Sequence, residues 1–229
     1  MSIKLEKFID DNINEAIIHA YSAYWESIKP HHYKDHLKRW LFALMSVHTT
    51  WENNVKGYNA IKGMDDWIHD RDKLNQHIKN SKTGLNVNRS KGIWEIATKF
   101  NNEKSRTYYN KRNDEDWQQY RNRIADDTFF LGLAKTSFAI TMCNPTESKV
   151  VCLDTHLLQF CGWKKNRNPS KKEYIEMEND WLNVCEKRKL PPGIVREIYW
   201  DKVQHKNNSR YWSYCLEDSY EKNSKQKIN

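Results

Sequence analysis

Residues 130–139 read FLGLAKTSFA, and residues 150–158 read VVCLDTHLL. In the first segment, a glycine turn enters an apolar helix that carries a lone lysine in its first turn. In the second, an apolar run ends in an aspartate, a residue type that commonly caps the helix that follows it. These two residues, Lys135 and Asp154, are 19 positions apart. The pair is therefore the first candidate for a reactive site.

The surroundings predicted for Lys135 favour a reactive amine. Leu133, Phe138 and Ala139 wall it in, and both desolvation and the positive end of a helix favour the neutral, nucleophilic form. A carboxylate at Asp154 could stabilise positive charge developing on a sugar, or move a proton. An amine and a carboxylate are the fewest groups that attack on the anomeric carbon of a nucleoside requires, one as the nucleophile and one to stabilise positive charge. Taken singly, the two residues leave open a solvated helix lysine and an aspartate that serves only as an N-cap.

The composition indicates an all-α protein. The 229 residues include only 7 glycines and 5 prolines, too few for the many turns of a β sandwich or barrel. Despite a mean hydropathy of −0.97, the 10 tryptophans, 12 tyrosines and 7 phenylalanines can supply a core. The net charge of +8 suits a polyanionic partner.

The sequence carries no sign of a membrane or export segment. No apolar stretch approaches the roughly 18 residues of a membrane span. The first residues, MSIKLE, are mixed rather than apolar. We therefore expect no membrane association and a cytoplasmic location, in a bacterial or virus-infected cell.

Helical periodicity recurs along the chain and predicts nine or ten helices with short connections. The apolar stripes cover residues 8–24, 37–48, 67–78, 93–100, 117–124, 129–142, 174–184 and 194–203. We expect Ser90 to open the fourth helix, Asp114 the fifth, and a capping box at Ser170 the seventh. Pro191-Pro192 precedes the last helix. The best strand candidate, 149–153, is short.

The cysteine spacing indicates neither a metal centre nor an iron–sulfur cluster. The five cysteines are Cys143, Cys152, Cys161, Cys185 and Cys215, and no two have the C-x2-C spacing of such sites. An odd number of cysteines without a secretion signal predicts reduced, mostly buried thiols. We expect no metal and no cofactor.

The segment G-x-x-K-T, followed by L-D-T-H, resembles the signature of the helix-hairpin-helix DNA glycosylases, the superfamily of endonuclease III. Residues 44–50, LMSVHTT, resemble a family segment from which a polar side chain reaches into the DNA helix, and His48 takes that place. Residues 194–203 resemble the late helix that packs behind the catalytic aspartate. The resemblance covers roughly residues 35 to 205, and residues 1–34 have no counterpart that we can place.

The resemblance implies an architecture. The family fold is all-α, with two helical subdomains, a helix-hairpin-helix motif, and the active site in the cleft between the subdomains. It implies one domain over residues 1–210, with a central subdomain at about 35–145. Residues 211–229 are a polar tail that we expect to be partly disordered.

The resemblance also assigns residues. Lys135 and Asp154 fall on the catalytic lysine and aspartate. The implied DNA contacts are His48, the hairpin residues Leu131, Gly132 and Leu133, Thr136, and the basic Lys164 and Lys165. The family hairpin carries glycines where this chain has Leu131 and Leu133, and the single Gly132 is displaced. The turn, and with it the grip on a DNA phosphate, is therefore expected to differ.

Three further side chains remain open to two interpretations. We expect His156 to pack or hydrogen-bond under Asp154 rather than to act in catalysis. Trp51 and Trp163 could stack on a base, although core packing is the simpler interpretation.

The function implied by the resemblance is that of a monomeric DNA glycosylase with abasic-site lyase activity. It would flip a damaged or modified base out of double-stranded DNA and cleave its N-glycosidic bond by lysine attack at C1′. One alternative is a phage-type transferase that adds an amine or amino acid to activated thymine on the same scaffold. A second is a DNA-binding protein without catalysis. The presence of both Lys135 and Asp154 argues against the second.

Overall fold

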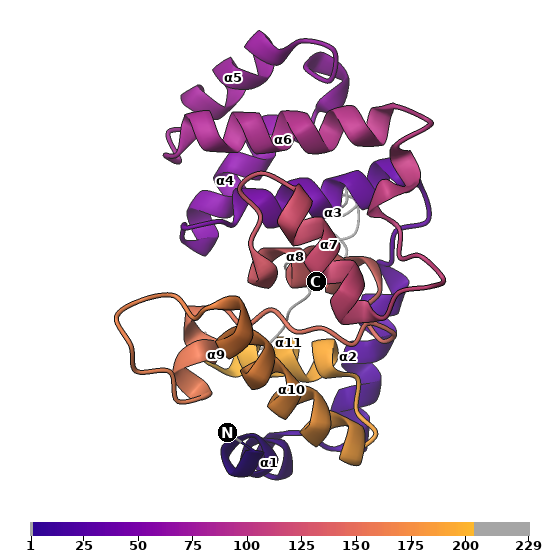
Figure 1. The fold of residues 1–229 in the computed structure, drawn as a ribbon, viewed down its shortest axis with the longest axis vertical. Coiled ribbons are helices and arrows are strands. Elements are labelled where there is room, and N and C mark those ends of the chain that lie inside the picture. Colours follow the sequence, from indigo (N-terminus) through magenta and orange to yellow (C-terminus); the bar gives the residue numbers. More distant parts are fainter. Residues whose placement is uncertain (1, 204–229) are drawn as a thin grey trace, which may run out of the picture.

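The fold is all-helical, as the composition and periodicity predict (Figure 1). The computed structural model describes residues 2–203, and the predicted tail, 211–229, lies outside the described residues. The described range contains eleven α-helices, two 3₁₀ helices and no strand. They are α1 (Ser2–Asn12), α2 (Glu15–Ser27), α3 (Tyr33–Met45), α4 (Trp51–Ile61), η1 (Met64–Asp66), α5 (Arg71–Asn80), α6 (Asn86–Asn101), η2 (Arg106–Tyr109), α7 (Trp117–Asp127), α8 (Leu133–Cys143), α9 (Thr155–Phe160), α10 (Lys171–Lys187) and α11 (Pro192–Val203).

The helices form two groups (Figure 1). In the first, α3 packs against α4, α6 and α8, α5 packs against α6, and α7 packs against α8. In the second, α1 packs against α10 and α2 against α11. The N-terminal residues that the family resemblance left unplaced therefore complete the second group, together with the C-terminal helices. Helix α9 lies beside α10 and α11 in the lower half of Figure 1.

Helix α3 is the centre of the first group. It buries Leu37 and every residue from Trp40 to Met45, so it is apolar almost all round in its second half. A helix buried on all sides must be surrounded by others, which explains why α4, α6 and α8 all pack on it. The end of α3 is therefore fixed, and the loop that follows it begins from a rigid support.

Three predicted boundaries are wrong, each because polar residues extend or shift a helix. Helix α6 begins at Asn86 rather than Ser90, because the buried Arg89 anchors its first turn by donating to the carbonyls of Thr83, Gly84 and Val47. Helix α7 is capped by Asp116 rather than Asp114, since Gln119 reciprocates and completes a capping box.

The third correction concerns the N-terminal stripe, which is two helices and brings the number above the predicted nine or ten. The first helix ends at Asn12, and Asn14 caps the second by accepting a hydrogen bond from the Ile17 N–H. The capping box at Ser170 is confirmed. The strand candidate 149–153 is wrong, because the Val151 backbone bonds to the side chains of Glu178 and Tyr174 rather than to another strand. Cys143, Cys152 and Cys185 are buried free thiols, as predicted.

A buried ion pair joins α7 to α10 beside the segment 150–153. Arg121 of α7 and Glu178 of α10 are both fully buried, and the guanidinium donates two hydrogen bonds to the carboxylate at 3.0 and 2.7 Å. Glu178 also accepts the Val151 N–H at 2.8 Å, and the Tyr174 hydroxyl donates to the Val151 carbonyl at 2.6 Å. Helix α10 thus holds the extended segment that leads to Asp154.

Replacing Arg121 with Met is expected to lower the free energy of unfolding by about 3–5 kcal/mol, because Glu178 would be left buried and unpaired. Urea denaturation measures this change. The control is Lys171→Met, which breaks an exposed ion pair with Asp126 and is expected to cost less than about 1 kcal/mol. Equal small losses for both variants would contradict a structural role for the buried pair.

Candidate active site

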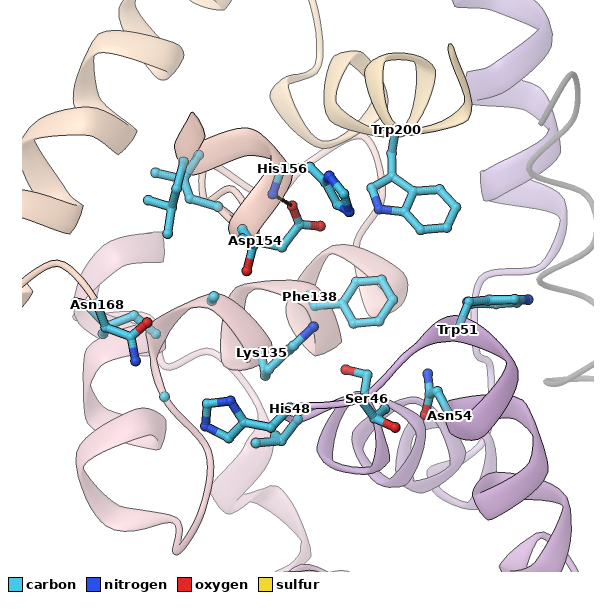
Figure 2. A pocket seen from close by; sticks show the side chains of 18 of the residues that line it. Ser46, His48, Trp51, Asn54, Lys135, Phe138, Asp154, His156, Asn168 and Trp200 are labelled. Carbon is cyan, nitrogen blue, oxygen red and sulfur yellow. Dashed lines mark hydrogen bonds between the residues drawn. The ribbon is translucent and has the colours of Figure 1, made fainter. Parts of the chain in front are cut away.

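A pocket of about 820 Å³ lies where the two helix groups meet (Figure 2). Its walls come from five parts of the chain: the loop after α3 with the start of α4, the start of α8, the residues around Asp154, the loop before α10, and α11. Lys135, Asp154 and His48 all line it. The sequence prediction that Lys135 and Asp154 share one location is therefore consistent with the structure.

Lys135 is half-buried on the first turn of α8. Within residues 2–203 its amine makes no hydrogen bond or ion pair, and its Nζ lies 5.8 Å from the centre of the Phe138 ring. Figure 2 shows the amine pointing into the space below Asp154. An amine without a partner in a pocket is available to react, and an aromatic wall limits its access to water.

Asp154 caps α9, as predicted, and both of its carboxylate oxygens are engaged. Oδ1 accepts the backbone N–H groups of His156 and Leu157 at 3.0 and 3.1 Å. Oδ2 accepts a hydrogen bond from Arg196 at 2.7 Å. Burial alone would raise the pKa of Asp154, but Arg196 and Lys135 outweigh it and hold this pKa below its usual range. The carboxyl group is therefore an anion at neutral pH.

Arg196 of α11 also lines the pocket, which the sequence did not predict. It is 4% exposed, and its guanidinium donates to Asp154 on one side and to Glu197 at 2.8 Å on the other. Burial raises the pKa of Glu197 to about 7. One feature of the sequence could have indicated Arg196. Arg196 and Glu197 are the only charged residues in the otherwise apolar run from Ile194 to Trp200, which would be expected to pack in the core.

Three solved structures of similar fold are described as 8-oxoguanine DNA glycosylases. The 8-oxoguanine glycosylase/lyase of Methanocaldococcus jannaschii, crystallised with a 15mer DNA containing 8-oxoguanine, has a TM-score of 0.70 and 18% identity, over 91% of this chain and 99% of that one. A second structure of the M. jannaschii 8-oxoguanine DNA glycosylase has a TM-score of 0.68 and 18% identity, over 89% and 94%. The Thermotoga maritima 8-oxoguanine DNA glycosylase has a TM-score of 0.66 and 15% identity, over 89% and 95%.

This chain has the 8-oxoguanine DNA glycosylase fold. The match extends over about nine-tenths of the chain. No protein-family model and no curated protein sequence matches the chain. The helix-hairpin-helix resemblance inferred from the sequence is confirmed at the level of fold.

In this glycosylase fold the hairpin connects α7 to α8. Gly132 is the N-cap of α8, with a φ of −91° that any residue could adopt, and an added Cβ would meet no atom within 4 Å. The left-handed position of the turn is Phe130, with a φ of 70°. The displaced glycine is thus not what shapes the turn.

The remaining predicted DNA contacts differ in accessibility. Leu131 is 3% exposed and the Thr136 side chain is fully buried, so neither side chain faces solvent. Gly132 and Lys164 are exposed, and Leu133 is half-buried. Lys165 is exposed but forms an ion pair with Glu173 at 2.7 Å.

His48 stands at the mouth of the pocket. It is exposed, it has a left-handed backbone with a φ of 48°, and its ring lies 6.5 Å from that of Phe130. Two non-glycine residues in this conformation, His48 and Phe130, therefore lie near each other in the pocket lining. Such a backbone is costly for residues with a Cβ and marks positions that the surrounding structure fixes.

Two tryptophans near the site have different surroundings. Trp51 lines the pocket next to Trp200, with their ring centres 6.0 Å apart, whereas Trp163 lies under Lys165 and Arg167 away from the pocket. The prediction that the His156 side chain sits beneath Asp154 is wrong. That side chain is exposed at the pocket wall, because the cap turn uses only its backbone N–H.

Within residues 2–203, no group of three or more His, Cys, Asp or Glu side chains is placed to hold a metal ion. None of the helices in this range has both the length and the apolar character needed to cross a bilayer.

Proposed function

We propose that this protein is a DNA glycosylase with abasic-site lyase activity. The observation that carries the proposal is the unpaired amine of Lys135 in the same pocket as the ionised Asp154. The similar fold of 8-oxoguanine glycosylases favours an oxidised purine, with 8-oxoguanine first, as the base released. The protein would act as a monomer on double-stranded DNA in the cytoplasm, with residues 1–210 as one domain.

In the proposed mechanism the damaged nucleotide leaves the base stack and enters the pocket. The amine of Lys135 loses a proton and attacks C1′, and the bond from C1′ to the base breaks with its electron pair leaving on the base, which takes up that proton. The anionic Asp154, held by Arg196, stabilises the positive charge that develops on the sugar. Opening of the sugar ring gives a Schiff base with Lys135, and loss of a proton from C2′ expels the 3′ phosphate.

The same geometry suggests how the DNA backbone is held. The N-terminus of α8 has no side-chain cap, so its first N–H groups and its positive dipole end are free to bind a phosphate next to the flipped nucleotide. His48 would fill the gap that the flipped base leaves. Lys164 and Lys165, on the loop before α10, would contact phosphates farther along.

The proposal is tested with a panel of labelled duplexes that each carry one damaged base, including 8-oxoguanine, or an abasic site. We expect free base and a strand nicked by β-elimination from at least one duplex, and nicking at the abasic site. Mass spectrometry separates base release from the alternative chemistry, since a transferase would add mass to the base and leave the strand intact. Intact DNA in every duplex would contradict the proposal.

Arg196→Met is expected to raise the pKa of Asp154, because burial would then act without the main opposing charge. In the wild type the pKa of Asp154 lies below its usual value, so Asp154 is expected to stay ionised at pH 5. The ratio of variant to wild-type excision rates should therefore fall as the pH is lowered from 8 to 5.

The matched control for this pH series is Glu197→Gln, which removes the other carboxylate on Arg196 but leaves the bond to Asp154. At pH 5, where burial keeps Glu197 protonated in the wild type as well, its rate ratio is expected to be close to one. A ratio for Arg196→Met that does not fall between pH 8 and pH 5 would show that Arg196 supports only the fold.

A further inference from the structure

One buried polar group in the pocket is not accounted for by the proposed mechanism. Asn54, in the first turn of α4, is 2% exposed and lines the pocket. Its Oδ1 is fully buried and has no hydrogen-bond partner, and within residues 2–203 no hydrogen bond of its side chain is present. A buried amide in this state loses its bonds to water without replacing them, so it usually indicates a missing partner.

Neighbouring groups do not explain Asn54. Thr50 already caps α4 by accepting the Asn53 N–H, so the helix does not need the Asn54 amide for capping. The Ser46 hydroxyl, beside Asn54 in Figure 2, donates to the Ala43 carbonyl at 2.6 Å. A position that served only packing would be apolar, since an apolar side chain carries no such cost.

The surroundings of Asn54 fit a flat aromatic ligand. Figure 2 shows Asn54 below Trp51, on the side of Lys135 away from His48 at the mouth. Phe138 and Trp200 line the same side of the pocket. Aromatic walls bind the faces of a base, whereas only a polar group can read its edge.

We propose that the Asn54 amide pairs with the edge of the flipped base, and that this edge is a lactam, an N–H next to a C=O. The amide oxygen accepts the base N–H, and the amide NH₂ donates to the base carbonyl, as in other bidentate contacts between side-chain amides and bases. Guanine and its 8-oxo derivative carry such an edge at N1 and O6. This assignment rests on the proposed glycosylase function and makes Asn54 a specificity residue.

The test compares two reactions of one enzyme. Excision of 8-oxoguanine needs recognition of the base, whereas borohydride trapping at an abasic site does not, because that site has no base. We expect Asn54→Leu to slow single-turnover excision by about 10- to 100-fold, the usual cost of a lost bidentate base contact. Trapping at the abasic site should stay within about twofold of the wild type, since the variant retains Lys135 and Asp154.

The matched control is Asn53→Leu, the exposed neighbour on the same helix, which should change neither reaction. The melting temperature supplies an independent readout, because Asn54→Leu removes an unpaired buried amide and is expected to leave the melting temperature unchanged or raised. Asn54→Ser is a smaller change and should also lose excision selectively.

Unchanged excision in Asn54→Leu, or equal losses of excision and trapping in both Asn54 variants, would overturn the role of Asn54. A wild-type protein that neither excises nor traps would overturn the proposed function itself. The two failures are therefore distinguishable in the same set of reactions.

Discussion

Asp154→Asn is expected to bind damaged duplex at least as tightly as the wild type and to release base on the order of 10³-fold more slowly. The charge is what matters, because Asp154 is an anion held by Arg196 beside the Lys135 amine. Asparagine is also a good N-cap, so its oxygen can still accept the N–H groups of His156 and Leu157 and preserve α9. Removing an anion near phosphates does not weaken DNA binding.

Single-turnover excision and equilibrium binding, measured on the same duplex, check this prediction. Turnover close to the wild-type rate would show that Asp154 is only a helix cap. A parallel loss of binding and turnover would instead place the effect in the fold, and the melting temperature of the variant would then be lowered.

Lys135→Gln is expected to lose base release and strand nicking by on the order of 10⁴-fold or more, as enzymes do when the nucleophile is removed. Glutamine keeps a long polar side chain on α8 but has no nucleophilic amine. Because the wild-type amine makes no hydrogen bond and no ion pair within residues 2–203, its loss breaks neither and should leave the fold intact.

The control is Lys164→Ala, on the exposed loop before α10. A phosphate contact contributes to DNA affinity and not to the chemical step. This variant should therefore bind DNA less tightly, and the slope of log affinity against log salt concentration should decrease by about one. On saturating DNA it should react at the wild-type rate. A Lys135→Gln variant that behaves in the same way would mean that Lys135 only holds phosphate.

The sequence predicts those features of the site that depend on residues close together in the chain. A lysine in the first turn of a helix, an aspartate before the next helix, and the spacing between them are all visible in two short segments. The same local rules predicted the capping box at Ser170 and the N-cap at Asp154. Their physical basis is short-range hydrogen bonding at helix ends, which depends on neighbours in the chain.

The parts that the sequence could not supply depend on contacts between distant segments. Arg196 and Asp154 are 42 positions apart in the chain. The residues next to each of them contain no pattern that predicts their hydrogen bond. Asn54 becomes a candidate only because the structure shows that it is buried beside the pocket and that its Oδ1 has no hydrogen-bond partner. The left-handed turn at Phe130 was also hidden, because a phenylalanine is an unusual residue for that conformation.

The central claim is that the Lys135 amine becomes covalently bonded to C1′ of the flipped nucleotide. The most direct measurement is borohydride reduction during reaction with a duplex that carries 8-oxoguanine or an abasic site, followed by protease digestion and mass spectrometry of the protein–DNA adduct. We expect one adduct, on the peptide that contains Lys135, and none in Lys135→Gln. An adduct on another lysine, or none with any duplex, would contradict this claim.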